Sequence, residues 1–351
     1  MDQLRTADTA FAGFVAECLS DRGFVLIDVG AAYGVSAAWR CFGNKLRGFG
    51  FEVDAEEVAR LNSIEPAPGF RYVAGHVGIP ADHPFAAKRH AAPSLRRNPW
   101  SRMAVRRWLD LEHAHKEGLT MQPKRPPASG DETYTAPGRP SHVIDLSAFL
   151  RAEGVTAVDF LKVDVDGADL DILQSMGGSY NDFGVLGIGV EVNFFGSDAD
   201  TDNTFHNIDR FLKSEEFELI DLSVRHYPMQ ELPGKVVCGF DVHGRPFQGD
   251  AFYARDICAP SAASFTKRLD AERLAKAAAI FAVCGLPDCA AEILLTFRDR
   301  LHPVLDIDRG LDLLARQAQR GRERPLSYAA YMAQFEQQSY SGSGCYSGPP
   351  S

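Results

Sequence analysis

The sequence predicts an α/β fold with a doubly wound, mainly parallel sheet, and two stretches of the chain carry this prediction. Residues 24–27 (FVLI) form a short apolar run that ends in the glycine-containing turn DVGAAYG at 28–34. Residues 158–163 form a second apolar run, which ends in DVDG and leads into the helical pattern ADLDILQSM. Apolar strands of this kind are typical of a parallel sheet that is buried on both faces, and their alternation with helices is typical of doubly wound folds.

Further segments continue the alternation in both directions. A first helix is expected over residues 8–22, where Phe11, Phe14 and Leu19 fall on one side. Strands are expected at 24–27, 48–52, 70–74, 158–163, 185–192, 217–222 and 250–254, and helices from about 36, over 55–62, from 146 to about 153, over 168–176 and over 203–213. From residue 261 to about 337 the pattern is helical, with amphipathic segments at 272–285, 290–301 and 309–319.

Composition places the chain among ordinary globular proteins. It has 351 residues, 45% hydrophobic and 24% charged, which suits one large domain or one domain with an appendage. No apolar run is long enough to span a bilayer, and the N-terminus lacks the basic region of a signal peptide. The seven cysteines are an odd number without a C-x-x-C pair, which argues against disulfides and zinc. A cytoplasmic protein is therefore expected.

Charge is distributed unevenly along the chain. The net charge is −10, which argues against a nucleic-acid partner, yet residues 80–140 carry eleven Lys/Arg and only six Asp/Glu. This basic, Pro-rich stretch interrupts the α/β pattern over residues 78–140. It is either a solvated insertion or a lid for an anionic acceptor.

Three groups of residues suggest chemistry at the carboxyl edge of the sheet: the turn at 28–34, Glu52, and the charged residues around the end of the strand at 158–163. The turn at 28–34 has the spacing G-x-x-x-G, so it lacks the dinucleotide fingerprint and suits a ligand without a pyrophosphate. Glu52 ends the second strand and can accept hydrogen bonds from a ribose diol, while Asp54 is placed to cap the following helix. Backbone N–H groups of the 28–34 turn are expected to be available to the ligand.

Lys162, Asp164 and Asp166 bracket the end of the strand at 158–163. A lysine in an apolar strand is costly unless it is paired or used in function. The alternative is a purely structural role for both residues, in which Asp166 caps the next helix and Lys162 pairs with a surface acid.

Five segments together resemble one known family. IDVGAAYG, FEVDAEEVARL, IDLSAFL, DFLKVDVDGADLDIL and GVEVNFF, in this order between residues 24 and 255, resemble the FkbM family of S-adenosylmethionine (SAM)-dependent methyltransferases. This chain has Ala32 where the family usually has Asn, and Asp166 where it usually has Glu. Ala32 lacks the side-chain amide that would contact the methionine end of the cofactor. Asp166 has a shorter side chain than Glu but keeps the same charge.

The resemblance implies a class I methyltransferase fold, a Rossmann-like sheet of seven strands whose last strand is antiparallel. It also implies SAM as cofactor, with Asp28, Gly30, Ala31 and Gly34 around the methionine and ribose. Glu52 would bind the ribose, the loop of Gly75, His76 and Val77 would flank the adenine, and Asp164 would also contact the cofactor. The implied reaction is O-methylation of a sugar, glycan or glycolipid precursor, or secondary-metabolite hydroxyl, on a small-molecule or carrier-linked acceptor.

Methyl transfer to a hydroxyl calls for a base near the methyl group. Candidate catalytic residues are Lys162, Asp164, Asp166 and Glu191, and the histidines at 76, 142, 206 and 226 are weaker candidates. A divalent metal is not expected, although Asp164, Asp166 and Glu191 would supply oxygen ligands if the reaction required one.

The expected organisation has four parts: an N-terminal helix (1–23), a methyltransferase domain (24–255) containing the insertion, a helical extension (256–337) and a disordered tail (338–351). The extension either closes the flank of the sheet or forms a homo-oligomer interface. Two other functions stay open, a non-catalytic SAM-binding scaffold and, with weaker support, a NAD(P)-dependent oxidoreductase.

Overall fold

The computed structural model describes residues 8–80, 143–165, 167–194, 200, 203–227 and 243–336. Nearly all of the basic insertion, Asp166, His142 and the C-terminal tail lie outside these residues. The strands are β1 (Phe24–Val29), β2 (Leu46–Glu52), β3 (Gly69–Ala74), β4 (His76–Val77), β5 (Val143–Ile144), β6 (Phe160–Val163), β7 (Gly187–Asn193), β8 (Glu218–Tyr227) and β9 (Arg245–Ala254). The helices are α1 (Ala10–Cys18), η2 (Ala37–Lys45), α2 (Ala55–Ile64), α5 (Leu146–Ala152), α6 (Asp169–Ser175), α7 (Phe205–Ser214), η4 (Pro260–Ala262), α8 (Ala263–Thr266), α9 (Ala271–Val283), α10 (Pro287–Thr296), α11 (Arg298–Leu301), α12 (Ile307–Ala318) and α13 (Tyr328–Glu336).

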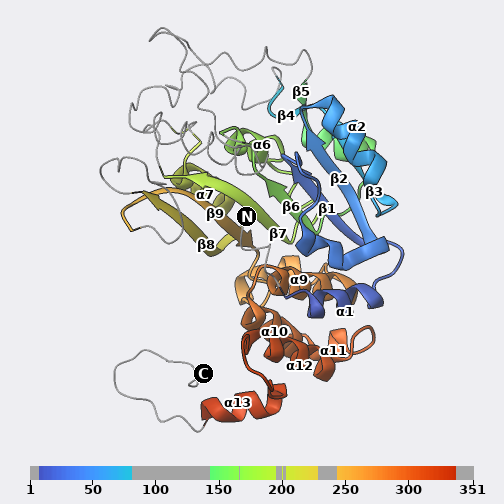
Figure 1. The fold of residues 1–351 in the computed structure, drawn as a ribbon, viewed down its shortest axis with the longest axis vertical. Helices are drawn as coiled ribbons and strands as arrows, with labels where there is room; N and C mark the ends of the chain where they lie inside the picture. The colour runs from blue at the N-terminus through green and yellow to red at the C-terminus, as the bar shows by residue number, and fades with distance from the viewer. Residues whose placement is uncertain are drawn as a thin grey trace.

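Seven strands form one sheet in the order β3-β2-β1-β6-β7-β9-β8 (Figure 1). β1 pairs in parallel with both β2 and β6, so the strand order reverses direction at β1. Only β9 runs antiparallel to its neighbours, β7 and β8. This topology confirms the predicted class I, Rossmann-like sheet, including the antiparallel last strand.

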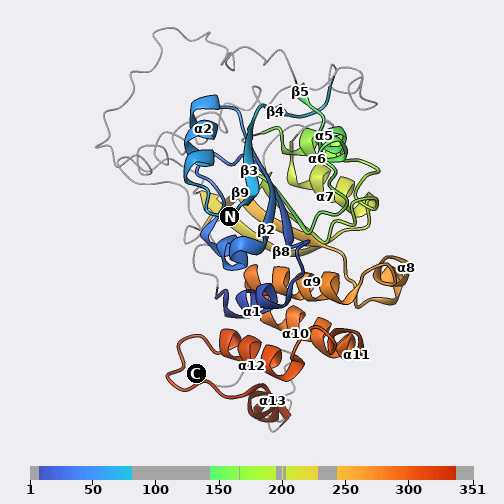
Figure 2. The same ribbon diagram turned by 90° about the vertical axis from the view of Figure 1, so that its right-hand side faces the viewer.

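Each face of the sheet is covered by its own set of apolar contacts. Alternate residues of β1 belong to different layers: Phe24 and Leu26 pack with α1, η2 and α2, whereas Ile27 and Val29 pack with α5, α6 and α7. Figure 2 shows α2 on one side of the sheet and α5, α6 and α7 on the other. Burial of both faces explains why the central strands are apolar at nearly every position.

Local structure departs from the sequence-based expectation at two places. The helix expected from residue 36 is a 3-10 helix, and Gly43 interrupts it with a non-helical backbone at φ 49°. His76 and Val77, expected in a loop, form the short strand β4, which pairs with β5 through Val143 and Ile144. A strand replaces the expected loop because Val77 is buried and because this segment pairs with residues 143–144, which follow the insertion in the sequence.

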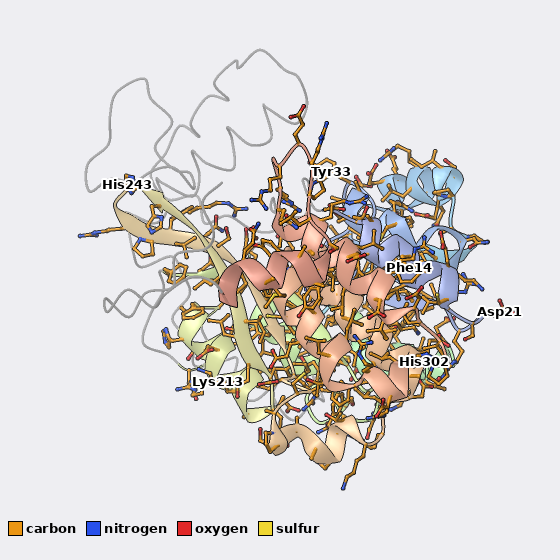
Figure 3. The ribbon with its side chains drawn as sticks, turned by 90° about the horizontal axis from the view of Figure 1, so that it is seen from below. Phe14, Asp21, Tyr33, Lys213, His243 and His302 are labelled. Carbon is orange, nitrogen blue, oxygen red and sulfur yellow. The ribbon has the colours of Figure 1, made fainter. Side chains whose placement is uncertain are left out.

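The C-terminal helices close the edge of the sheet at which the parallel strands begin. They lie below the sheet in Figures 1 and 2, opposite the edge where β2 leads into α2. Helix α9 is buried along almost its whole length, and Phe281 makes an edge contact with Phe252 of β9. Seen from below (Figure 3), Phe14 of α1 lies beside these helices. The helical extension therefore packs against the flank of the sheet, and a homo-oligomer interface on it stays a prediction.

A buried charge cluster attaches α9 to the sheet. Asp159, directly before β6, is fully buried and accepts a hydrogen bond of 2.7 Å from the backbone N–H of Val25. Its carboxylate also pairs with Arg273 at 2.5 Å and with Lys276 at 3.2 Å, both on α9. The cluster fixes the start of β1 and β6 relative to the C-terminal helices.

Among the described residues, no helix has the length and apolar character needed to cross a lipid bilayer.

Asp159→Asn is expected to lower the free energy of unfolding by about 3–5 kcal/mol, because it keeps the shape of the side chain but leaves buried Arg273 without its carboxylate. Urea denaturation measures the change. Asp182→Asn is the matched control: Asp182 pairs with Arg151 at the surface, and its loss should cost less than about 1 kcal/mol. Equal losses in the two variants would contradict the role assigned to the Asp159 cluster.

Candidate active site

A lysine and two carboxylates link β1 to β6 at the carboxyl edge of the sheet. Register places Asp28 beside Lys162, and Lys162 Nζ lies 2.9 Å from Asp28 Oδ1 and 3.6 Å from Asp164 Oδ2. Nζ also donates to the carbonyl of Gly30 at 3.1 Å. Burial alone would lower the pKa of Lys162, but the charges of Asp28 and Asp164 raise it above its usual range. Burial raises the pKa of Asp28, and the Lys162 ammonium opposes that shift.

The turn after β1 requires glycine at position 30. Gly30 has φ 88°, and a Cβ there would overlap the backbone carbonyl of Asp164. The N–H groups of Gly30 and Ala31 both donate to the carbonyl of Phe51 at 3.0 Å. The expectation that the N–H groups of this turn are free for a ligand is therefore wrong at these two positions, because the end of the neighbouring strand β2 accepts them.

Glu52 ends β2 beside this turn. Its Oε1 accepts hydrogen bonds from the backbone N–H groups of Val53 and Asp54 at 2.8 and 3.1 Å, which fixes the carboxylate. Asp54 caps α2 by accepting from the N–H groups of Glu56 and Glu57, as predicted. The N–H of Gly75 donates to the backbone carbonyl of Glu52, so the segment leading to His76 and Val77 begins next to the backbone of Glu52.

The turn after β6 is held by a residue that the sequence reading missed. Asp169, at the start of α6, accepts from the N–H groups of Val165 and Gly167 at 3.1 and 3.3 Å. Asn203 donates to the same carboxylate at 2.9 Å. Asp169 is the first residue of α6, and its carboxylate accepts from the turn before the helix rather than from a helical N–H group. The cap considered for Asp166 stays a prediction, because Asp166 lies outside the described residues. An acid in the first turn of the helix after DVDG was the available signal.

Glu191 lies on β7 in a second group of buried polar side chains. Its carboxylate pairs with Arg225 of β8 at 3.2 Å and accepts from Gln248 of β9 at 3.3 Å. Arg225 also lies 3.6 Å from Asp250. Glu191, Arg225 and Gln248 are each less than 8% exposed, so Glu191 is a fixed, ion-paired carboxylate.

Sheet register relates the two groups. Lys162 pairs with Gly189 and Val163 with Val190, so Asp164 and Glu191 follow equivalent positions at the ends of adjacent strands. Alternation along the strands places Asp28, Lys162 and Glu191 on the face opposite the α5–α7 layer. Four candidates from the sequence contact or closely approach one another: Asp28, Gly30, Lys162 and Asp164. Glu191 pairs with Arg225 and Gln248 instead. His206 lies near Thr204, on the helix that follows β7.

Within the part of the chain that the structure describes, no group of three or more His, Cys, Asp or Glu side chains is arranged to hold a metal ion. Two of the three carboxylates considered as ligands, Asp164 and Glu191, instead lie beside Lys162 and Arg225.

The sequence comparison supplies the identification that this geometry leaves open. The model of the "Methyltransferase FkbM domain" matches residues 28–219, which is more than half of the chain and contains the Gly30 turn, Glu52, Lys162 and Glu191. The chain belongs to the FkbM methyltransferase family. A comparison with curated proteins gives no significant match.

Solved structures similar to this FkbM methyltransferase are only distantly related to it. A SAM-dependent methyltransferase from Aquifex aeolicus aligns with TM-score 0.30 and 9% identity over 72% of this chain and 93% of that chain. A TehB-like SAM-dependent methyltransferase from Corynebacterium glutamicum aligns with TM-score 0.27 and 10% identity over 71% of this chain and 89% of that chain. The assignment of the fold rests on the strand order, and the assignment of the family rests on the domain match.

Gly30→Ala is expected to destabilise the protein more than Gly285→Ala. Both glycines have positive φ, but a Cβ at Gly285 has open space around it. Gly285→Ala should cost about 1–2 kcal/mol for the backbone conformation alone. Gly30→Ala should cost about 1–3 kcal/mol more, because the new methyl group must displace the turn after β6. Equal losses in chemical denaturation would show that the two turns do not restrain each other.

Asp169 predicts a specific pH dependence of stability. Burial raises its pKa from the usual 3.8 to about 6, so the folded state binds a proton more tightly than the unfolded state. The free energy of unfolding of the wild type, relative to Asp169→Asn, should therefore be highest below about pH 4 and fall by up to about 3 kcal/mol as pH rises through 6. Urea melts of both proteins between pH 4 and 7 measure this difference, and a difference that is flat or rises with pH would contradict the assignment.

Proposed function

We propose that this FkbM methyltransferase transfers the methyl group of SAM to a hydroxyl of a small-molecule or carrier-linked acceptor. The observation that carries the proposal is a band of polar side chains on one face of the sheet. It begins with Asp28 and Lys162 on β1 and β6 and continues through Glu191 on β7 to Gln248 on β9 and Arg225 on β8. In doubly wound sheets, ligands bind outside the carboxyl ends of the strands where the strand order reverses.

The described residues fit SAM at the β1 and β2 end of this band. Gly30 lets the turn after β1 lie directly against the turn after β6, and Gly34 has φ 78° in the same segment. Glu52 offers a carboxylate that is fixed at the end of β2, as a ribose diol requires. Asp28, Ala31 and the segment from His76 to Val77 are assigned to the same ligand. When bound, SAM supplies a methyl group that is already activated by a sulfonium.

Asp164 is the carboxylate best placed to accept the proton of the acceptor hydroxyl. Its side chain is 35% exposed at the end of β6, and Lys162 orients it from 3.6 Å. Glu191 is buried and bound by Arg225, which suits it to orienting the acceptor rather than to exchanging protons. Asp166 follows in the same turn, and its role stays a prediction from the sequence. Positioning of the hydroxyl and removal of its proton are then the contributions of this chain.

The acceptor side of the band is suited to a ligand that donates hydrogen bonds. Asn193 Oδ1 and Gln248 Oε1 are buried and accept no hydrogen bond within the described residues. Hydroxyl groups of a sugar or a hydroxylated metabolite are donors of the required kind. The basic composition of residues 80–140 favours an anionic group elsewhere on the acceptor.

Glu52→Ala is expected to weaken SAM binding at least tenfold while Asp164→Ala keeps binding within a few-fold and loses methyl transfer. Isothermal titration with SAM and S-adenosylhomocysteine, with and without EDTA, measures binding. Transfer of a radiolabelled methyl group to a panel of hydroxylated sugars and metabolites measures the reaction. The reversed pattern would exchange the roles of the two residues. Binding by the wild type without transfer to any hydroxylated acceptor would favour the scaffold alternative.

A further inference from the structure

The turn between β6 and α6 is held in place by residues from two distant parts of the chain. Asp169 Oδ1 accepts from the N–H of Val165, and Oδ2 accepts from the N–H of Gly167 and from Asn203 Nδ2. Asn203 lies directly before the residue that caps α7, and its Oδ1 accepts from the N–H of Leu170 at 2.8 Å. Both side chains are at least 95% buried. Asp169 and Asn203 therefore form one closed, solvent-protected hydrogen-bonded unit around the start of α6.

The turn that this unit fixes forms one wall of the cofactor side of the site. The N–H of Asp164 donates to the carbonyl of Val29 at 3.0 Å, and the Asp164 carbonyl fills the space that a Cβ on Gly30 would need. Lys162 joins the carbonyl of Gly30 to the carboxylate of Asp164. A shift of the turn after β6 would therefore move the glycine turn after β1 as well.

The same unit reaches toward the acceptor side. Asn193, at the end of β7, donates from Nδ2 to the backbone carbonyl of Asn203 at 3.5 Å, and Gln248 faces Asn193 in the register of β7 and β9. Asn203 is thus placed between the turn that carries Asp164 and the strand that carries Glu191.

A buried carboxylate is costly, and no ion pair joins Asp169 to a cationic side chain within the residues that the structure describes. Burial raises the pKa of Asp169, and the charge of Asp164, which has the same sign, raises it further and adds to this cost. An apolar side chain would avoid this cost at a position that served packing alone. The cost is consistent with a requirement for both oxygens as acceptors at this turn.

We propose that Asp169 and Asn203 are positioning residues, which act through Asp164, Val165 and Gly167 to hold the cofactor site of this methyltransferase in its binding geometry. The proposal rests on the cofactor binding assigned under the proposed function, but not on the identity of the acceptor. Neither residue needs to touch the cofactor for this role.

The test is the affinity of the full chain for S-adenosylhomocysteine, measured by isothermal titration at a temperature where every variant is folded. Asp169→Ala should weaken binding at least tenfold and Asn203→Ala at least threefold. The double variant should bind no more weakly than Asp169→Ala, because the two side chains act as one unit. Asp169→Asn keeps an oxygen for the N–H of Val165, so it should recover part of the affinity lost in Asp169→Ala.

Asp306→Ala is the matched control, because Asp306 also accepts from a backbone N–H beside a helix start but lies directly before α12, at the opposite edge of the sheet. It should lower the melting temperature without changing affinity. Affinities of Asp169→Ala and Asn203→Ala within twofold of the wild type would overturn the proposal, as would equal affinities of Asp169→Asn and Asp169→Ala. If Asp169→Ala does not fold, Asn203→Ala and Asp169→Asn decide the question, and no loss in either would overturn it.

The wild-type titration separates this proposal from the proposed function. No binding of S-adenosylhomocysteine by the wild type would overturn the cofactor assignment and this proposal together. Normal binding with the expected losses in the variants, but no transfer to hydroxyl groups, would overturn O-methylation and leave the positioning roles in place.

Discussion

The arrangement of the site depends on the buried ion pair between Asp28 and Lys162. The pair crosses from β1 to β6 at the point where the strand order reverses, and it takes two charges out of water in the middle of an apolar sheet. The cost of burying these charges is offset only if both partners stay in place, so each fixes the other. Because Lys162 also reaches Gly30 and Asp164, this one ammonium group contacts both of the turns that surround the site.

The opposite edge of the sheet is fixed in a similar way by a different cluster. Asp159 lies directly before β6 and Lys162 lies within it, so buried ion pairs hold this short strand at two points. The pair with Arg273 joins the sheet to α9, and the apolar contacts of α9 then draw the C-terminal helices into the same core as α1. The candidate site lies at the carboxyl edge of the sheet, while the C-terminal helices pack against the amino edge.

Asp164 and Glu191 differ in burial, and the roles proposed for them follow from this difference. Asp164 is partly exposed and has one lysine nearby, whereas Glu191 is enclosed between Arg225 and Gln248. A proton acceptor must reach its substrate, and an orienting group must not move. In the proposed function, the polar band combines one partly exposed carboxylate with a rigid acceptor side, and we infer that Asp169 and Asn203 connect the two through the backbone.

The sequence by itself determined the order of the elements, the parallel sheet and the turns after β1 and β6. Apolar strands, glycine turns and helix caps are local signals, so they can be recognised without the folded structure. The glycine turn after β1 and the cap at Asp54 were predicted correctly for this reason, and Lys162 was recognised as a residue that had to be paired or used. Only the tertiary structure decided which carboxylate pairs with which cation, because Asp28 and Lys162 are 134 residues apart and Glu191 and Arg225 are 34 apart. It also decided that β2 occupies the N–H groups of Gly30 and Ala31 and that Asn203 supports the turn beside Asp164. These contacts depend on strand register and on chain segments that meet only in the folded protein, and no periodicity in the sequence encodes them.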